Sequence, residues 1–415
     1  MNKNTTLPPL IFLVVACVLA LMVITQQPPA NGWLEQHDSK SYILDGEPVA
    51  GWQKIDGTQY YFGDDYFLRT GWQVIDGNTY FFHPDGSMHT GWLEIDEAQY
   101  YLTEDGTLAT GWQIINGKVY YFNTDGITVT GLAEIDGTTY LLGDQGLVTG
   151  AWEEIDDNLY YADGQGCPVT GWVTINGATH YFEETGIAAN GWVELDGFAH
   201  YFYKNGAPAQ GEMTVDGKLC RFASNGQLII LVNPWNYLPE DYTVELETID
   251  ELHQIAAIAY PSFLEMMEDC KAAGLEPAVC SAYRTHEQQD KLYQNRIARY
   301  RRAGYADDRA VELAGQSVAI PGTSEHQLGL ALDIVDDNNW ALDETQANTP
   351  TQKWLLENSW RYGWILRYPN EKSEITGIIY EPWHYRYVGK TIAKEIYESG
   401  LCLEEYLQML TTSVG

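Results

Sequence analysis

Basic residues are scarce in this chain, which has 58 aspartates and glutamates against 23 lysines and arginines in 415 residues. The formal net charge of -35 at pH 7 opposes binding to nucleic acids or to an anionic membrane surface. The remaining composition, 45% hydrophobic and 20% charged, is typical of folded domains. Since one domain usually has about 100–200 residues, we expect more than one domain.

Cysteine is also scarce, with six copies and no Cys-x-x-Cys spacing, which argues against a zinc-thiolate site. Export from the cytoplasm would permit disulfides. Cys270 and Cys280 are the pair best placed for one, because they lie at the end of a predicted helix and in the next predicted strand. The alternative is that both are buried free thiols.

Long apolar runs are rare, and the clearest one lies at residues 10–24, with Lys3 the only charged residue in the first thirty. This run is shorter than the roughly 20 residues that span a bilayer, although residues 7–9 could extend it. We therefore expect residues 1–30 to be a signal peptide or an uncleaved N-terminal membrane anchor, and the rest of the chain to be extracellular.

Aromatic residues are abundant, and between Gly32 and Gly226 they recur with a period of 20. An aromatic cluster such as Tyr60-Tyr61-Phe62 follows eight residues after most of the repeated tryptophans. Leu132 and Glu212 occupy the tryptophan position in two weaker repeats. The tryptophans are Trp33, Trp52, Trp72, Trp92, Trp112, Trp152, Trp172 and Trp192.

Most repeats carry a strong hairpin signal between their two apolar segments, for example Asp56-Gly57 or Asn116-Gly117. Such pairs favour a two-residue turn that needs positive φ at both positions. One hairpin cannot bury its aromatic face alone, whereas stacked copies can. The sequence therefore predicts an all-β hairpin solenoid of 20-residue repeats over residues 31–228.

With the form Gly-Trp-x-x-Ile-x-Gly-x-x-Tyr-Tyr-Phe, the repeats resemble the cell-wall-binding repeats of Gram-positive surface proteins, which include choline-binding proteins, clostridial toxin tails and glucan-binding domains. The second tryptophan of a choline cage is replaced, for example by Gln59 and Thr79, so the toxin-like or glucan-like form is closer. The resemblance implies a cell-wall carbohydrate or teichoic acid as ligand. The alternative is that the aromatic residues only form the stacking core. The expected wall-ligand-binding residues are Trp52, Trp72, Trp92, Trp112, Trp172 and Trp192.

Residues 229–415 mix helical and strand patterns and predict one α+β domain. Helices are expected at 250–258, 261–273, 287–302, 307–314 and 351–358, with two more within 391–410. Strands are expected at 277–282 and 330–335 and within 378–388. The chain is therefore predicted to be multidomain, with a repeat array followed by an α+β domain.

One segment of this domain, residues 321–333, places His326 seven positions before Asp333, with Gly329 between them. A glycine-broken loop that enters a buried strand would hold a nitrogen and an oxygen ligand near one point, as a metal site requires. The sequence Glu381-Pro382-Trp383-His384 could complete that site.

Three short motifs in this order, Ser-Ala-Tyr-Arg at 281–284, Ser-x-His-x-x-Gly-x-Ala-x-Asp at 324–333 and Glu-x-x-His at 381–384, resemble a known family. It is the zinc metallopeptidase family of D-alanyl-D-alanine carboxypeptidases and dipeptidases, particularly the VanY-like D,D-carboxypeptidases. The resemblance covers roughly residues 229–410. It implies an α+β zinc peptidase domain.

The resemblance implies that His326, Asp333 and His384 bind Zn2+ and leave one position open for water. It implies that Glu381 is the general base and that Arg284 stabilises developing negative charge. The alternatives are that Glu381 is a structural ion-pair partner and that Arg284 only anchors a loop.

The resemblance also implies that Gln289 and Ser324 hold the substrate, and we expect Trp383 to form a wall of the pocket. His286 opens a predicted helix and is expected at the surface. The basic residues at 296–302 are expected to be a solvated helix face, or alternatively a contact with an anionic wall polymer.

These inferences predict an exported zinc D-alanyl-D-alanine carboxypeptidase that trims peptidoglycan stem peptides while its repeats hold it to the cell wall. The expected domains are the signal or anchor segment at 1–30, the repeat array at 31–228 and the peptidase domain at 229–415. An L,D-carboxypeptidase, an endopeptidase and a non-catalytic wall-binding surface protein remain the alternatives.

Overall fold

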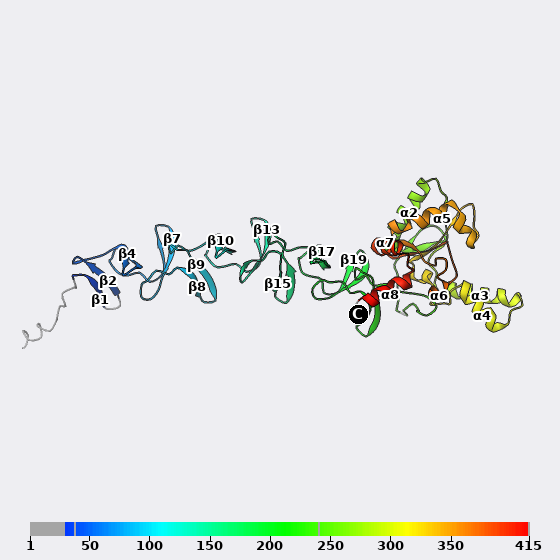
Figure 1. Ribbon diagram of the computed structural model, residues 1–415, viewed down its shortest axis with the longest axis horizontal. Coiled ribbons are helices and arrows are strands. Elements are labelled where there is room, and N and C mark those ends of the chain that lie inside the picture. The colour runs from blue at the N-terminus through cyan, green and yellow to red at the C-terminus, as the bar shows by residue number, and fades with distance from the viewer. Residues whose placement is uncertain (1–29, 37–38, 240, 414–415) are drawn as a thin grey trace, which may run out of the picture. The chain divides into compact units, whose positions relative to one another are not determined.

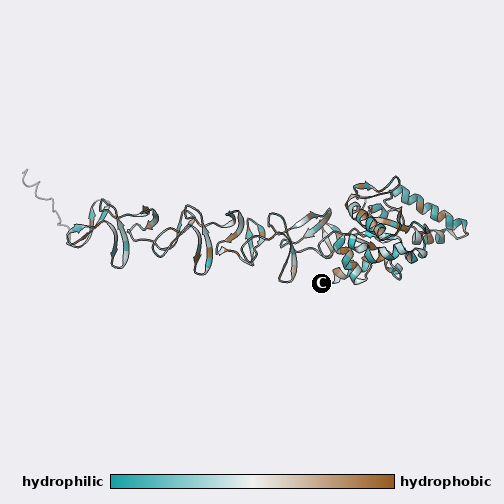
Figure 2. Ribbon diagram, turned by 90° about the horizontal axis from the view of Figure 1, so that it is seen from above, coloured by the Kyte–Doolittle hydropathy of each residue, from teal (hydrophilic) through white to brown (hydrophobic). Residues whose placement is uncertain are grey.

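A computed structural model of the protein describes residues 30–36, 39–239 and 241–413. Their contacts form two compact units, one reaching Glu153 together with Ala162–Pro168, the other comprising Glu154–Tyr161 and the chain from Val169 onward. Within the described ranges no helix is long and apolar enough to cross a membrane, and Figure 2 shows hydrophobic residues only in short stretches of ribbon. The predicted signal or anchor segment lies outside the described residues, apart from Ala30.

The first unit is a series of β-hairpins, as the repeats predict (Figure 1). In the hairpin of β4 and β5, Trp52 lies opposite Tyr61, and the turn residues Asp56 and Gly57 have φ of 51° and 88°. Positive φ at both positions is the geometry for which Asp-Gly is selected. The strands are β1 (Gly32–Gln36), β2 (Ser39–Leu44), β3 (Glu47–Pro48), β4 (Gly51–Ile55), β5 (Thr58–Phe62), β6 (Gly71–Ile75), β7 (Asn78–Phe82), β8 (Gly91–Ile95), β9 (Ala98–Leu102), β10 (Gly111–Ile115), β11 (Lys118–Phe122), β12 (Gly131–Ile135), β13 (Thr138–Gly143) and β14 (Gly146–Leu147).

Successive hairpins are joined by main-chain hydrogen bonds as well as by apolar packing. The Met88 amide donates to the Gln59 carbonyl at 2.9 Å, and the Leu108 amide donates to the Thr79 carbonyl at 2.8 Å. Phe62, Phe82 and Phe122, the last residues of their strands, are fully buried. Each repeat thus supplies both backbone partners and a core for its neighbour, which is the organisation of a solenoid.

The second unit contains the last hairpins and an α+β domain. Strands β15 (Trp152–Ile155) and β16 (Asn158–Tyr161) come before these hairpins in the sequence. The hairpin strands are β17 (Gly171–Ile175), β18 (Ala178–Phe182), β19 (Gly191–Leu195), β20 (Phe198–Phe202), β21 (Gly211–Val215) and β22 (Lys218–Phe222). A small antiparallel pair, β23 (Leu246–Thr248) and β24 (Gln254–Ala256), follows them.

The α+β domain is built on an antiparallel sheet of order β25-β26-β28-β27. Its strands are β25 (Pro277–Ser281), β26 (Ala331–Asp336), β28 (His384–Tyr387) and β27 (Trp364–Leu366). All residues of β26 are buried, as its continuous apolar run predicts. The α-helices are α2 (Tyr260–Ala272), α3 (His286–Arg302), α4 (Asp307–Ser317), α5 (Pro350–Asn358), α6 (Ser373–Thr376), α7 (Lys390–Ser399) and α8 (Leu403–Ser413), and the short 3-10 helices are η1 (Ala257–Ala259), η2 (Glu325–Leu328), η3 (Glu344–Asn348) and η4 (Ser359–Tyr362).

One predicted helix, at residues 250–258, is wrong. The Asp250 carboxylate accepts hydrogen bonds from the amides of Leu252 and His253, at 2.8 and 2.9 Å. An aspartate side chain can accept hydrogen bonds from the backbone of a tight turn in the same way as it caps a helix, so an aspartate in the sequence does not distinguish a turn from a helix start. Here it closes the turn between β23 and β24, and only η1 is helical.

The last hairpins contact the α+β domain through backbone and side chains. The Glu212 amide donates to Thr411 Oγ1 at 3.1 Å, and Gln227 Nε2 donates to the Val388 carbonyl at 3.1 Å. The Phe198 and Tyr387 rings stack with centroids 5.9 Å apart. These contacts explain why the hairpins after Val169 belong to the same compact unit as the sheet.

The disulfide suggested for Cys270 and Cys280 does not form, because every cysteine among the described residues is free. Cys270 is buried on α2, where burial and then the Asp336 charge raise its pKa to about 11. Burial and then the Asp333 charge raise the pKa of Cys280. The alternative of free thiols therefore holds, with Cys270 buried and Cys280 partly buried.

Candidate metal centre and catalytic site

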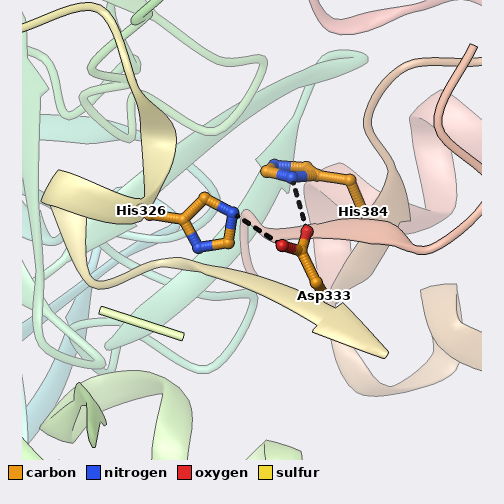
Figure 3. Close-up of side chains that lie close together, drawn as sticks. All are labelled: His326, Asp333 and His384. Atoms are coloured by element: carbon orange, nitrogen blue, oxygen red, sulfur yellow. Dashed lines mark hydrogen bonds and ion pairs between the residues drawn. The ribbon is translucent and has the colours of Figure 1, made fainter. Parts of the chain in front are cut away.

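Three segments bring His326, Asp333 and His384 together (Figure 3). Asp333 and His384 are register partners on the neighbouring strands β26 and β28. His326 lies in η2, which ends at Leu328 with Gly329 as its C-cap, shortly before β26 begins. The sheet register and this short helical turn therefore position all three residues of the cluster.

Asp333 lies between the two imidazoles. Its Oδ2 is 3.3 Å from His326 Nε2, and its Oδ1 is 3.1 Å from His384 Nδ1. One donor atom from each residue lies within 4.8 Å of the others, and all three residues are buried. Two imidazoles and one carboxylate gathered in this way fit a zinc ion that keeps a fourth position open.

A hydrogen bond to a main-chain carbonyl fixes the ring orientation of His326. Its Nδ1 lies 2.7 Å from the Ala282 carbonyl, an oxygen that can only accept, so Nδ1 carries the hydrogen and Nε2 keeps its lone pair. Burial, and then the Arg284 charge, lower the pKa of His326 to about 4. The imidazole is therefore neutral at physiological pH, as a metal ligand must be.

His384 and Asp333 form the charged part of the cluster. Burial opposes the charge of His384, but the carboxylates of Asp333 and Glu325 outweigh it and raise its pKa to about 9. Burial likewise opposes the charge of Asp333, and the two histidines outweigh it, so that its pKa stays well below the usual range. This negative environment favours a cation, since an ion bound at His384 Nδ1 displaces a proton there.

Glu381 stands next to the cluster, with Oε2 at 3.8 Å from His384 Nδ1. Its side chain is 14% exposed. Burial, joined by the Asp333 charge, raises its pKa to about 7 against the opposing charges of His384 and Arg284. A carboxyl group that titrates near neutrality is suited to accept a proton and then release it.

Arg284 lies on the other side of the cluster. Its Nη2 is 3.1 Å from Asp333 Oδ2, and its Nε donates to Ser281 Oγ at 2.9 Å. Gln289 is fully buried, where its Nε2 donates to the Ala319 carbonyl at 2.7 Å and its Oε1 accepts from Arg284 Nη1 at 3.4 Å. Gln289 therefore contacts Arg284, and it does not line the cavity itself.

A cavity of about 250 Å³ opens beside the cluster. Ser324 and Trp383, both predicted to contact substrate, line it, as do the apolar side chains of Leu292 and Ile379. Arg296 lines it as well, so this member of the basic run on α3 is not part of a fully solvated face. His286 is exposed at the start of α3, as expected.

Sequence reasoning missed a buried ionic network behind the metal cluster. Its members are Glu325, Arg367, Arg386 and Glu404, with Arg367 fully buried. Two signals were available, since Glu325 directly precedes His326 in the quoted motif and Arg386 follows His384 by two positions in β28. In a strand this spacing puts two side chains on the same face.

The repeated tryptophans lie between consecutive hairpins. Trp52 packs edge-on against Tyr61 of its own hairpin at 5.2 Å and against Tyr80 of the next at 4.8 Å. Trp92 repeats this arrangement with Tyr101 and Tyr120 at 5.3 and 4.9 Å. The rings therefore belong to the stacking core, yet five of the six keep more than a third of their surface exposed, and Trp52 is partly buried. The exposed five are Trp72, Trp92, Trp112, Trp172 and Trp192.

Known proteins match both parts of the chain. The family model for VanY, D-alanyl-D-alanine carboxypeptidase, matches residues 252–390. The model for the choline-binding repeat matches residues 69–110, 109–146 and 169–205, and one for a cell wall binding repeat matches residues 50–65.

A D-alanyl-D-alanine carboxypeptidase of Enterococcus faecalis is 45% identical over 179 residues, which are 43% of this chain and 65% of that relative. The bifunctional D-Ala-D-Ala dipeptidase and D-Ala-D-Ala carboxypeptidase VanXYC of Enterococcus gallinarum is 35% identical over 150 residues, which are 35% of this chain and 74% of that relative. A solved structure of VanYB in complex with D-alanine-D-alanine is 46% identical and covers 43% of this chain and 96% of its own, with a TM-score of 0.40. The chain thus spans just under two thirds of the length of the Enterococcus faecalis relative.

Proposed function

Since the chain belongs to the VanY family of D-alanyl-D-alanine carboxypeptidases, we propose that it is a zinc-dependent carboxypeptidase that removes D-alanine from peptidoglycan stem peptides. The observation that carries this proposal is the buried cluster of His326, Asp333 and His384, which lines a cavity together with the neighbouring Glu381. A merely structural ion cluster would not need a neighbouring carboxyl group with a pKa of about 7.

In this proposal, Nε2 of His326, the carboxylate of Asp333 and Nδ1 of His384 hold the zinc ion. Bound zinc supplies a Lewis acid that polarises a carbonyl group and acidifies water. The Ala282 carbonyl keeps His326 in the required tautomer, and the sheet register holds the other two ligands in place.

Glu381 acts as the general base. It takes a proton from the attacking water, whose oxygen forms the new bond to the carbonyl carbon, and it delivers that proton to the amine nitrogen as the peptide bond breaks. Its raised pKa fits both halves of this transfer. The Arg284 guanidinium stabilises the negative charge that develops on the carbonyl oxygen. Ser324 and Trp383 orient the peptide in the cavity, and Gln289 supports Arg284.

The repeats, in this proposal, bind a cell-wall carbohydrate or teichoic acid through Trp52, Trp72, Trp92, Trp112, Trp172 and Trp192. The partial exposure of these rings and the match to wall-binding repeats support that role. We also propose that the chain is exported at a Gram-positive cell surface. Residues 1–30 serve as its signal peptide or membrane anchor, residues 31–228 as the wall-binding array and residues 229–415 as the peptidase domain.

The test is zinc analysis of the purified protein together with a panel of stem peptides followed by mass spectrometry. We expect release of D-alanine from a pentapeptide that depends on zinc and is lost in Glu381→Gln. Preferential cleavage of a tetrapeptide would assign an L,D-carboxypeptidase instead. A protein that carries a full complement of zinc yet cleaves none of the peptides would contradict an enzymatic role.

A further inference from the structure

Glu325 directly precedes the metal-cluster residue His326 and is buried completely at its side chain. One of its oxygens, Oε1, accepts two strong hydrogen bonds. Arg367 Nε donates to it at 2.7 Å, and Arg386 Nη1 donates to it at 2.9 Å. A carboxylate held by two arginines inside a protein keeps its charge and has little freedom to turn.

The other oxygen of Glu325, Oε2, has no hydrogen bond among the described residues, and neither has Nε2 of His384. Both atoms are buried, and they lie 3.5 Å apart, slightly beyond the length of an ordinary N–H···O bond. A buried polar atom without a partner is costly, so two such atoms facing each other are best explained as one contact. A small rotation of the imidazole would close it.

We propose that Glu325 is a positioning residue for the metal centre. Its free oxygen accepts the Nε2 hydrogen of His384, and this contact turns the lone pair of Nδ1 toward the metal. The inference rests on the proposed zinc site. Carboxylates that orient a metal-bound histidine through its second nitrogen raise the affinity for the metal without touching it.

The surrounding ionic network explains why Glu325 stays in position. Arg367 donates from Nη1 and Nη2 to both oxygens of Glu404, at 2.8 and 2.6 Å. The two arginines and two glutamates balance in charge, as a buried network requires. Glu404 shares Arg367 with Glu325 but makes no contact with His384 among the described residues, so it provides a matched control.

The experiment compares Glu325→Gln with Glu404→Gln in the full chain and measures zinc affinity by competition with a chelator. We expect Glu325→Gln to bind zinc about 10–100-fold more weakly. Glu404→Gln should keep the wild-type affinity, although both variants lower the melting temperature of the metal-free protein. Zinc binding by Glu325→Gln as tight as that of the wild type, or an equal loss in both variants, would overturn the proposal.

A second variant covers the case in which Glu325→Gln does not fold, because the amide leaves a positive charge buried. Glu325→Asp keeps the negative charge for the arginines but withdraws the oxygen from His384 by one methylene. It should fold and still bind zinc more weakly than the wild type, and unchanged affinity would again refute the proposal. A wild-type protein that binds no zinc would instead refute the proposed function itself.

Discussion

The contact between the last hairpin and α8 can be tested with one added methyl group. Gly211 begins β21 with φ of 72°, and a Cβ at this position would lie 2.6 Å from Thr411 Cα and 2.8 Å from its amide nitrogen. These are backbone atoms, so the helix itself must move in Gly211→Ala. Gly191 holds the same place in the preceding hairpin, with φ of 76° and no atom within 4 Å of its missing Cβ. Gly191→Ala is therefore the control.

Both variants force alanine into the left-handed region, which costs about 1–2 kcal/mol. Only Gly211→Ala adds the cost of overpacking, about 1–3 kcal/mol. If α8 retreats, the hydrogen bond from the Glu212 amide to Thr411 is also lost, which costs about 0.5–1.5 kcal/mol. The expected difference between the two variants is thus about 1.5–4.5 kcal/mol by the same estimates.

Urea denaturation of both full-length variants would measure this difference, and hydrogen exchange would show where it arises. We expect the amides of α8 to exchange faster in Gly211→Ala than in Gly191→Ala, because only the first variant displaces that helix. Equal destabilisation, or unchanged exchange in α8, would show that the hairpin does not support the peptidase domain.

Three further predictions concern function. The pKa of about 7 for Glu381 means that kcat/KM should fall as the pH drops, because the protonated carboxyl group cannot accept a proton. Bound zinc lowers this pKa, so the midpoint of the fall lies at or below pH 7. A rate that rises on acidification would contradict the role of Glu381 as general base. Arg296 lines the cavity, so Arg296→Gln should lower kcat/KM for a stem peptide about tenfold, which corresponds to the loss of one charged hydrogen bond. Arg299 lies on the exposed side of α3, so Arg299→Gln should have no effect. Trp92→Ala should weaken cosedimentation of the full chain with purified cell walls, measured with and without teichoic acid. Leu132 occupies the same repeat position without an aromatic ring, so Leu132→Ala should not weaken it. Equal losses in the two variants would indicate that the Trp92 ring only stabilises the array.

Local chemistry explains which parts of the fold could be predicted. Asp56-Gly57 between two apolar runs strongly favours a two-residue hairpin turn, and the short apolar run around Ile334 favours a buried strand. The helix expected near Asp250 was wrong because an aspartate caps turns and helices alike. The edge strand β27 of the four-stranded sheet has only three residues and lacks a distinctive pattern, so the sequence does not predict it.

The site, too, has parts that local sequence patterns predict and parts that they do not. His326, Asp333 and His384 could be proposed because their motifs are short and ordered, and the structure brings them together. The network behind them joins residues far apart in the chain: the local motifs contain Glu325 and lie close to Arg386, but no local pattern pairs these residues with Arg367 or Glu404. The contact of Thr411 with β21 is equally non-local.

The hydrogen bonds from Gln227 to Val388 and from Ser224 to Glu395 also bear on how the enzyme would search for its substrate. A flexible linker would let the active site sample a wide volume around its anchor, at an effective concentration set by the linker length. Here the hairpins after Val169 and the peptidase domain form one compact unit. Wall polymer held at Trp172 or Trp192, as we propose, would therefore lie at a fixed distance from the metal cluster. The enzyme would cut the stem peptides within that reach and would have to release the polymer before it could act on others.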